Sequence, residues 1–138
     1  MSNTKEYDVR TRKIIDPDRR KALMLLSDES DSDVLVPVLR EKRFRLLGMT
    51  SDLTQGLELM RKHKVGIVFL DEDMESLELE VILNQIKSKH PGFSVIMLGA
   101  QVTKEKIEFA FAHGAVAYLV KPLRPEAVIK SMSKFSLS

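Results

Sequence analysis

Five short apolar runs alternate with stretches of helical periodicity along this chain, and this alternation most constrains its fold. The runs cover residues 22–26, 46–47, 65–70, 95–98 and 117–120. The third is the longest, is rich in Val and Ile and lacks polar alternation, as is typical of a strand covered on both faces. Five strand–helix units joined by short loops predict an α/β fold with a doubly wound sheet.

The helical stretches carry apolar residues on one face and residues suited to their ends. Ser51 or Asp52, and Thr103, are positioned to cap helices. Pro37 falls inside the first helix, where proline removes a hydrogen bond, so we expect that helix to begin late, near Val36, or to have a distorted first turn. The apolar faces are Leu35/Val38/Leu39, Leu53/Leu57/Met60, Leu79/Ile82/Leu83/Ile86, Ile107/Ala110/Phe111 and Val128/Ile129/Met132/Phe135.

Composition bounds the kind of protein. A chain of 138 residues predicts one domain, which we place at 21–138, after a polar arm or linker at 1–20. The sequence has no cysteine, which excludes disulfides and thiolate metal sites and fits a cytoplasmic location. Acids and bases nearly balance without a basic stripe, and no apolar run approaches membrane-spanning length, so we expect neither nucleic acid nor membrane as a partner.

Three of the runs end in residues that suit phosphoryl transfer. The first is followed by Ser27 and Asp28, the third by Asp71, and the fifth by Lys121. In an open parallel sheet the ligand site lies beyond the carboxyl ends of the strands, so these side chains should converge. Two carboxylates can hold a hard divalent cation, and an ammonium group can neutralise a phosphoryl oxygen.

The order and spacing of four segments resemble a response regulator receiver domain, the phosphoacceptor half of bacterial two-component signalling. These segments are the Asp28 region, Leu70-Asp71-x-x-Met74, Val95–Ala100 and Ala117–Leu123. The resemblance covers about Lys21 to Phe135. It implies the flavodoxin-like, CheY-like strand order, a five-stranded parallel sheet in a three-layer sandwich.

The resemblance also implies roles for individual residues. Asp71 would be the phosphoacceptor, attacking the phosphoryl group of a phosphohistidine on a histidine kinase or phosphotransfer protein. Mg²⁺ would be held by Asp28, Asp71 and the backbone carbonyl of Asp73. Lys121 would contact the phosphoryl group, and its peptide bond to Pro122 would be cis. The domain would catalyse at most its own phosphorylation and dephosphorylation, and would otherwise not be an enzyme.

Departures from the family pattern bear on whether the domain switches. Ser27 stands where the family has a further acid, and Gly99 stands where it has the Thr or Ser that couples phosphorylation to an aromatic side chain, here Tyr118. Gly99 would leave space for Tyr118 to turn inward without a trigger. Glu29 and Asp73 are candidates to compensate for the missing acid, and the amide near Ala100 is a candidate phosphate contact. The loop at Glu75-Ser76 also differs from the family.

Two functions fit these features. The first is a working receiver that signals to a downstream protein, with the fourth helix, fifth strand and fifth helix as the partner or homodimer face. The second is a pseudo-receiver, an interaction module that acts without phosphorylation. A flavodoxin-like nucleotide- or flavin-binding enzyme is disfavoured, because its phosphate loop uses backbone amides and the acidic loop 27–31 repels phosphate.

Overall fold

The computed structural model describes residues 6–8, 13–15, 20–74, 84 and 94–133. Its main feature is a five-stranded sheet in which every neighbouring pair is parallel. In spatial order the strands are β4 (Arg45–Thr50), β3 (Lys21–Leu25), β5 (Ile67–Asp71), β6 (Ser94–Gly99) and β7 (Ala115–Val120). All five predicted strands and the flavodoxin-like order are therefore confirmed.

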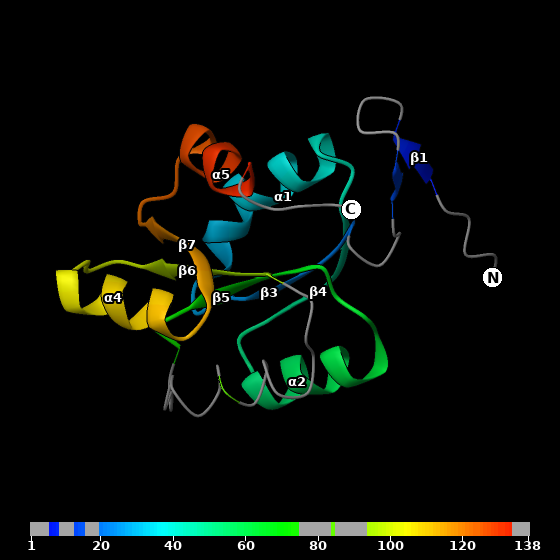
Figure 1. Ribbon diagram of the computed structural model, residues 1–138. Helices are drawn as coiled ribbons and strands as arrows, with labels where there is room; N and C mark the ends of the chain where they lie inside the picture. The colour runs from blue at the N-terminus through cyan, green and yellow to red at the C-terminus, as the bar shows by residue number, and fades with distance from the viewer. Residues whose placement is uncertain (1–5, 9–12, 16–19, 75–83, 85–93, 134–138) are drawn as a thin grey trace.

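Four described helices cover the two faces of the sheet. One face carries α1 (Ser32–Glu41) and α5 (Pro125–Met132), and the other carries α2 (Leu53–Lys62) and α4 (Lys104–Ala112), as Figure 1 shows. The third predicted helix, with Leu79 to Ile86, and the Glu75-Ser76 loop lie outside the described residues. No helix in the described ranges is long and apolar enough to cross a bilayer.

The helix ends follow the local signals of the sequence. Asp52 caps α2 by accepting from the Thr54 and Gln55 amides, and Thr103 caps α4 by accepting from the Lys106 amide. The late start predicted for the first helix is wrong. A 3₁₀ turn, η2 (Glu29–Asp31), leads directly into α1 at Ser32, and Pro37 is accommodated inside the helix on its exposed side.

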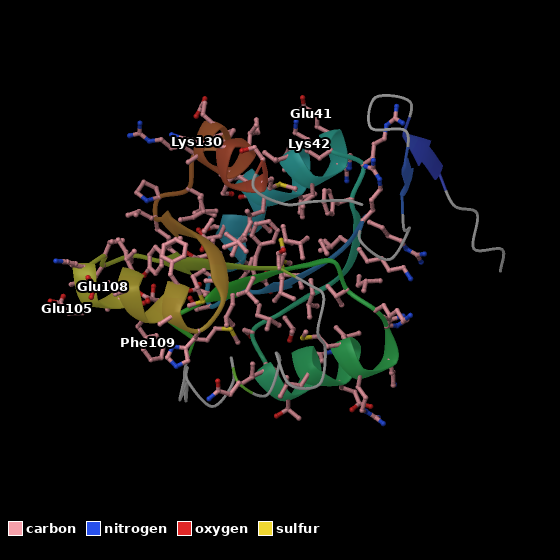
Figure 2. All side chains as sticks on the ribbon, viewed as in Figure 1. Glu41, Lys42, Glu105, Glu108, Phe109 and Lys130 are labelled. Atoms are coloured by element: carbon pink, nitrogen blue, oxygen red, sulfur yellow. The ribbon has the colours of Figure 1, made fainter. Side chains whose placement is uncertain are left out.

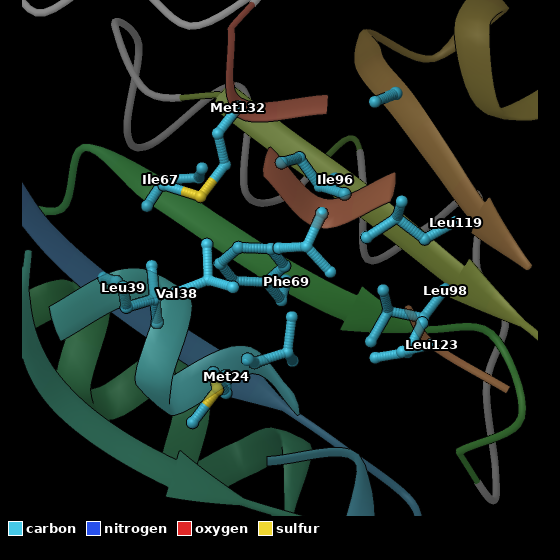
Figure 3. Packing of buried hydrophobic residues seen from close by; sticks show 14 of the residues in the cluster. Met24, Val38, Leu39, Ile67, Phe69, Ile96, Leu98, Leu119, Leu123 and Met132 are labelled. Carbon is cyan, nitrogen blue, oxygen red and sulfur yellow. The ribbon is translucent and has the colours of Figure 1, made fainter. Parts of the chain in front are cut away.

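The central strand β5 shows why an unbroken apolar run makes the middle of the sheet. Ile67 and Phe69 pack into the core under α1 and α5, while Val68 and Leu70 pack into the core on the α2 and α4 side. Figure 3 shows Phe69 at the centre of the first core, between Val38, Ile96 and Met132. Because β5 is buried on both faces, packing fixes the position of its last residue, Asp71.

Ahead of the sheet, the polar arm contains two short strands that the sequence pattern does not predict. They are β1 (Glu6–Asp8) and β2 (Lys13–Ile15), which pair antiparallel. Ile14-Ile15 is the one apolar pair in that region, so hydrophobic alternation gives no signal for a hairpin there.

Candidate functional site

Asp71 is the centre of the site. It is the last residue of β5, and its side chain is 0% exposed. Its Oδ2 accepts hydrogen bonds from the Ser27 amide (3.1 Å), the Ser27 hydroxyl (2.7 Å) and the Lys121 ammonium (2.6 Å), while Oδ1 accepts from the Asp73 amide (2.9 Å). Burial by itself raises the pKa of Asp71, but the hydrogen bonds from Lys121, Ser27 and Asp73 outweigh it and hold the pKa below its usual range. A buried carboxylate is thereby kept ionised.

Lys121 joins the loops after three strands. It follows β7, and its Nζ lies 2.6 Å from Asp71 Oδ2, 3.1 Å from Asp31 Oδ2 and 3.7 Å from Asp73 Oδ2. Its side chain is 14% exposed, and the Lys121–Pro122 peptide bond is cis, as expected. Burial lowers the pKa of Lys121, but the hydrogen bonds to Asp71 and Asp31 outweigh burial and raise it. One ammonium group therefore sits among three carboxylates.

The acids of the loop after β3 point in different directions. Asp28 is exposed, and its Oδ1 caps η2 by accepting from the Ser30 amide at 2.9 Å, a bond that lowers the pKa of Asp28. Glu29 is exposed in η2. The carboxylate of this loop that reaches Lys121 belongs to Asp31, whose side chain is 12% exposed.

The loop after β5 is tied to the end of β6. The Glu72 amide donates to the Leu98 carbonyl at 2.9 Å, and the Ala100 amide donates to Asp73 Oδ2 at 3.3 Å. The Ala100 N–H, a candidate phosphate contact, is thus directed at the Asp73 carboxylate. The Glu72 side chain turns the other way, where Oε1 lies 3.3 Å from the Lys106 ammonium of α4.

Gly99, at the end of β6, is buried and closely surrounded. A Cβ added there would come within 3.0 Å of both the Tyr118 hydroxyl and the Glu72 carboxylate, closer than real Cβ atoms approach. Tyr118, on β7, thus has its hydroxyl directed at the backbone of residue 99. Burial and the neighbouring Glu72 carboxylate raise the pKa of the Tyr118 phenol.

Comparison with known proteins identifies the family. The model of the response regulator receiver domain matches residues 27–133, which is most of the chain. The chain belongs to the response regulator receiver domain family. Among curated relatives it is 25% identical over 92 residues to the transcriptional regulatory protein MalR of Bacillus subtilis (67% of this chain, 39% of that protein), and 30% identical over 89 residues to the chemotaxis protein CheY of Listeria monocytogenes (62% and 75%).

Solved structures agree on the fold of this receiver domain. A response regulator from Thermotoga maritima superposes with a TM-score of 0.74 at 22% identity, covering 83% of this chain and 94% of that one. The chemotaxis protein CheY4 of Vibrio cholerae gives 0.73 at 20% identity, covering 84% and 98%. The first curated relatives are longer: the chain spans 39% of MalR and 42% of the transcriptional regulatory protein PdtaR of Mycobacterium tuberculosis.

The oxygen atoms near Asp71 are the type of ligand that magnesium prefers. Within the described residues, no three acidic or histidine side chains gather to hold a metal by themselves. Mg²⁺ needs fewer, because it keeps several waters and is commonly bound by one or two carboxylates together with substrate phosphates. Asp28, Asp71 and the Asp73 backbone lie on two loops beyond the carboxyl ends of β3 and β5, and Asp31 Oδ2, 3.1 Å from Lys121 Nζ, adds a further carboxylate oxygen. This excess of hard oxygen atoms fits a divalent cation.

Sequence reasoning missed two residues of the site. Asp31 reaches Lys121, and Glu72 fills the space beside Gly99. Both lie close in sequence to residues that were singled out, Asp28 and Asp71. The sequence shows that both loops are acidic. Which acid turns inward depends on η2 in the first loop and on the hydrogen bond from the Glu72 amide to the Leu98 carbonyl in the second.

Proposed function

We propose that this receiver accepts a phosphoryl group on Asp71 from the phosphohistidine of a histidine kinase or phosphotransfer protein. A carboxylate oxygen forms the new bond to phosphorus as the phosphorus–nitrogen bond breaks, and the bonding electrons leave with the imidazole, which takes up a proton. The product is an acyl phosphate, which water later hydrolyses. Such a transfer asks the protein mainly for positioning and charge neutralisation.

The observation that carries this proposal is the 2.6 Å contact between Lys121 and the buried Asp71 carboxylate. The lowered pKa keeps the nucleophile anionic, and the ammonium group is in place to balance charge on the transferred oxygens. Asp28, Asp71 and the Asp73 carbonyl would hold Mg²⁺, which would supply further neutralisation of the phosphoryl oxygens. Because Ser27 brings no charge, we expect this binding to be weak.

Treatment with acetyl phosphate or phosphoramidate and magnesium, followed by intact mass measurement, tests the assignment. We expect a gain of one phosphoryl group in the native protein and none in Asp71→Asn. Lys121→Met should slow the gain by about 10²-fold, because it removes the neutralising cation. Glu108→Gln, a change on the exposed outer side of α4, is the control and should label like the native protein.

A gain that persists in Asp71→Asn would overturn the choice of Asp71. No gain with any phosphodonor would instead favour the second candidate, a pseudo-receiver that binds partners without phosphorylation. Two contacts support that candidate: the hydrogen bonds from the neutral Ser27 to Asp71, and the Tyr118 hydroxyl beside Gly99.

For either candidate, we propose that the downstream protein docks on the face formed by α4, β7 and α5. Residues of all three elements, Phe111, Tyr118 and Lys130 among them, line a hollow of about 300 Å³. Phe111, which lines the hollow, is exposed, and Val120 on β7 and Ile129 on α5 are further exposed apolar side chains of these elements. Glu105 and Glu108 lie on the outer side of α4 (Figure 2), and Lys130 of α5 lines the hollow, so the face combines apolar and charged side chains.

A further inference from the structure

Two side chains share the space that a residue larger than glycine would fill at position 99. The Tyr118 hydroxyl and Glu72 Oε1 both lie within 3.0 Å of the point where a Cβ would stand on Gly99. The two oxygens are therefore neighbours. Neither position is compatible with a Thr or Ser at residue 99 unless a side chain moves.

Glu72 is an unusual group to find in that space. Its side chain is 10% exposed, and a buried carboxylate is costly unless it is paired. The pairing comes from Lys106 on α4, at 3.3 Å, and the hydrogen bond from the Glu72 amide to the Leu98 carbonyl fixes the backbone from which the side chain projects. The carboxylate is thus held in place from two sides.

The Tyr118 hydroxyl needs a partner in this position. It is buried and has no hydrogen bond of regular geometry with any described residue. Buried hydroxyl groups are nearly always hydrogen-bonded, and the Glu72 carboxylate beside Gly99 is the charged acceptor next to the Tyr118 hydroxyl.

We infer that Glu72 is the positioning residue for Tyr118: its carboxylate occupies the space beside Gly99 and holds the Tyr118 hydroxyl inward without a phosphoryl group. The contact links the loop after Asp71 to β7 and, through Lys106, to α4. It rests on the proposed function only in treating Tyr118 as part of the partner face. The Glu72 carboxylate then holds Tyr118 inward, although residue 99 has no hydroxyl group.

The orientation of Tyr118 can be measured directly in the full chain by NMR, in the absence of any phosphodonor. We expect the native protein to show nuclear Overhauser cross-peaks between the Tyr118 ring and the α-protons of Gly99. Glu72→Leu keeps the bulk of the side chain but removes the acceptor, so the cross-peaks should be lost. Glu72→Gln keeps an acceptor and should retain the cross-peaks. If Glu72 only filled space, the Gln and Leu variants would give the same result.

A second variant removes the other half of the contact. In Tyr118→Phe the ring has no hydroxyl to donate, so its cross-peaks to Gly99 should also be lost, even if Glu72→Leu does not fold. Glu58→Leu is the matched control, since it makes the same chemical change on the exposed side of α2, away from the docking face, and it should leave the cross-peaks unchanged.

The inference is overturned if the native protein lacks the Tyr118–Gly99 cross-peaks, or if they persist at native intensity in either Glu72→Leu or Tyr118→Phe. Loss in Glu72→Gln to the same extent as in Glu72→Leu would also contradict it. None of these measurements depends on phosphorylation. Their failure therefore leaves the assignment of Asp71 standing, and a failed phosphorylation assay leaves the role of Glu72 standing.

Discussion

At the residue scale, the balance of charge around one ammonium group defines the site. Lys121 faces Asp31, Asp71 and Asp73, so the cluster keeps an excess of negative charge. Coulomb attraction of this kind is strong where water is largely excluded, and both Lys121 and Asp71 are largely buried. The arrangement keeps Asp71 ionised, and its net negative charge would attract a cation.

Acid unfolding should report on the Asp71 carboxylate. Its pKa is lowered in the folded state, so its contribution to stability is complete above its unfolded pKa of about 4 and is lost as pH falls from there through the folded pKa. Between about pH 5 and pH 2 the free energy of unfolding of the native protein should fall more steeply than that of Asp71→Asn. Urea titrations at several pH values measure both slopes, and parallel slopes would show that the pKa of Asp71 is not lowered.

At the scale of the elements, close approach between α2 and β3 decides the effect of a helix glycine. Gly56 is buried in α2, and a Cβ there would come within 3.0 Å of Leu25 Cδ2, on β3. Leu25 is itself fully buried and has little room to move. The glycine lets the helix pack against the sheet at this point, whatever its effect on helix propensity.

Replacing Gly56 should therefore destabilise the protein. Helix propensity alone predicts that Gly56→Ala gains up to ~1 kcal/mol, but overpacking a tight core costs roughly 1–3 kcal/mol. We expect a net loss of about 1 kcal/mol in the free energy of unfolding. Leu25→Val shortens the opposing side chain, so Gly56→Ala should cost less in that background. An unchanged cost, or a stabilising Gly56→Ala, would contradict the close contact.

At the scale of the whole molecule, the two edges of the sheet expose different surfaces. The β7 edge, with α4 and α5, carries the hollow and the exposed Phe111, Val120 and Ile129. The β4 edge exposes the apolar side chains Leu46 and Met49. The two edges therefore provide a matched comparison.

If the α4–β7–α5 face is also the homodimer face, a charge placed there should weaken self-association. Phe111 is 45% exposed and Leu46 37% exposed, so Phe111→Asp and Leu46→Asp make similar changes on opposite edges. We expect Phe111→Asp to weaken association by at least tenfold, about 1.4 kcal/mol, and Leu46→Asp to leave it unchanged. Sedimentation equilibrium measures both. The reverse result would assign self-association to the β4 edge.

The sequence by itself determined the layout of the fold. Unbroken runs such as Val65–Leu70 specify buried strands, helical spacing specifies the apolar faces, and single residues such as Asp52 and Thr103 specify helix starts. These signals are local, because the period of the hydrophobic pattern follows from backbone geometry alone. Asp71 and Lys121 both follow the carboxyl ends of parallel strands, so their proximity was predictable as well.

Only the tertiary structure decided which neighbouring acids complete the site. Asp28 and Asp31 lie on one loop, yet Asp28 caps η2 while Asp31 reaches Lys121. Glu72 and Asp73 are adjacent, yet one faces Tyr118 and the other faces Lys121. The physical reason is that a side chain in a loop takes its direction from hydrogen bonds to distant strands, and hydrophobic periodicity carries no information about those bonds.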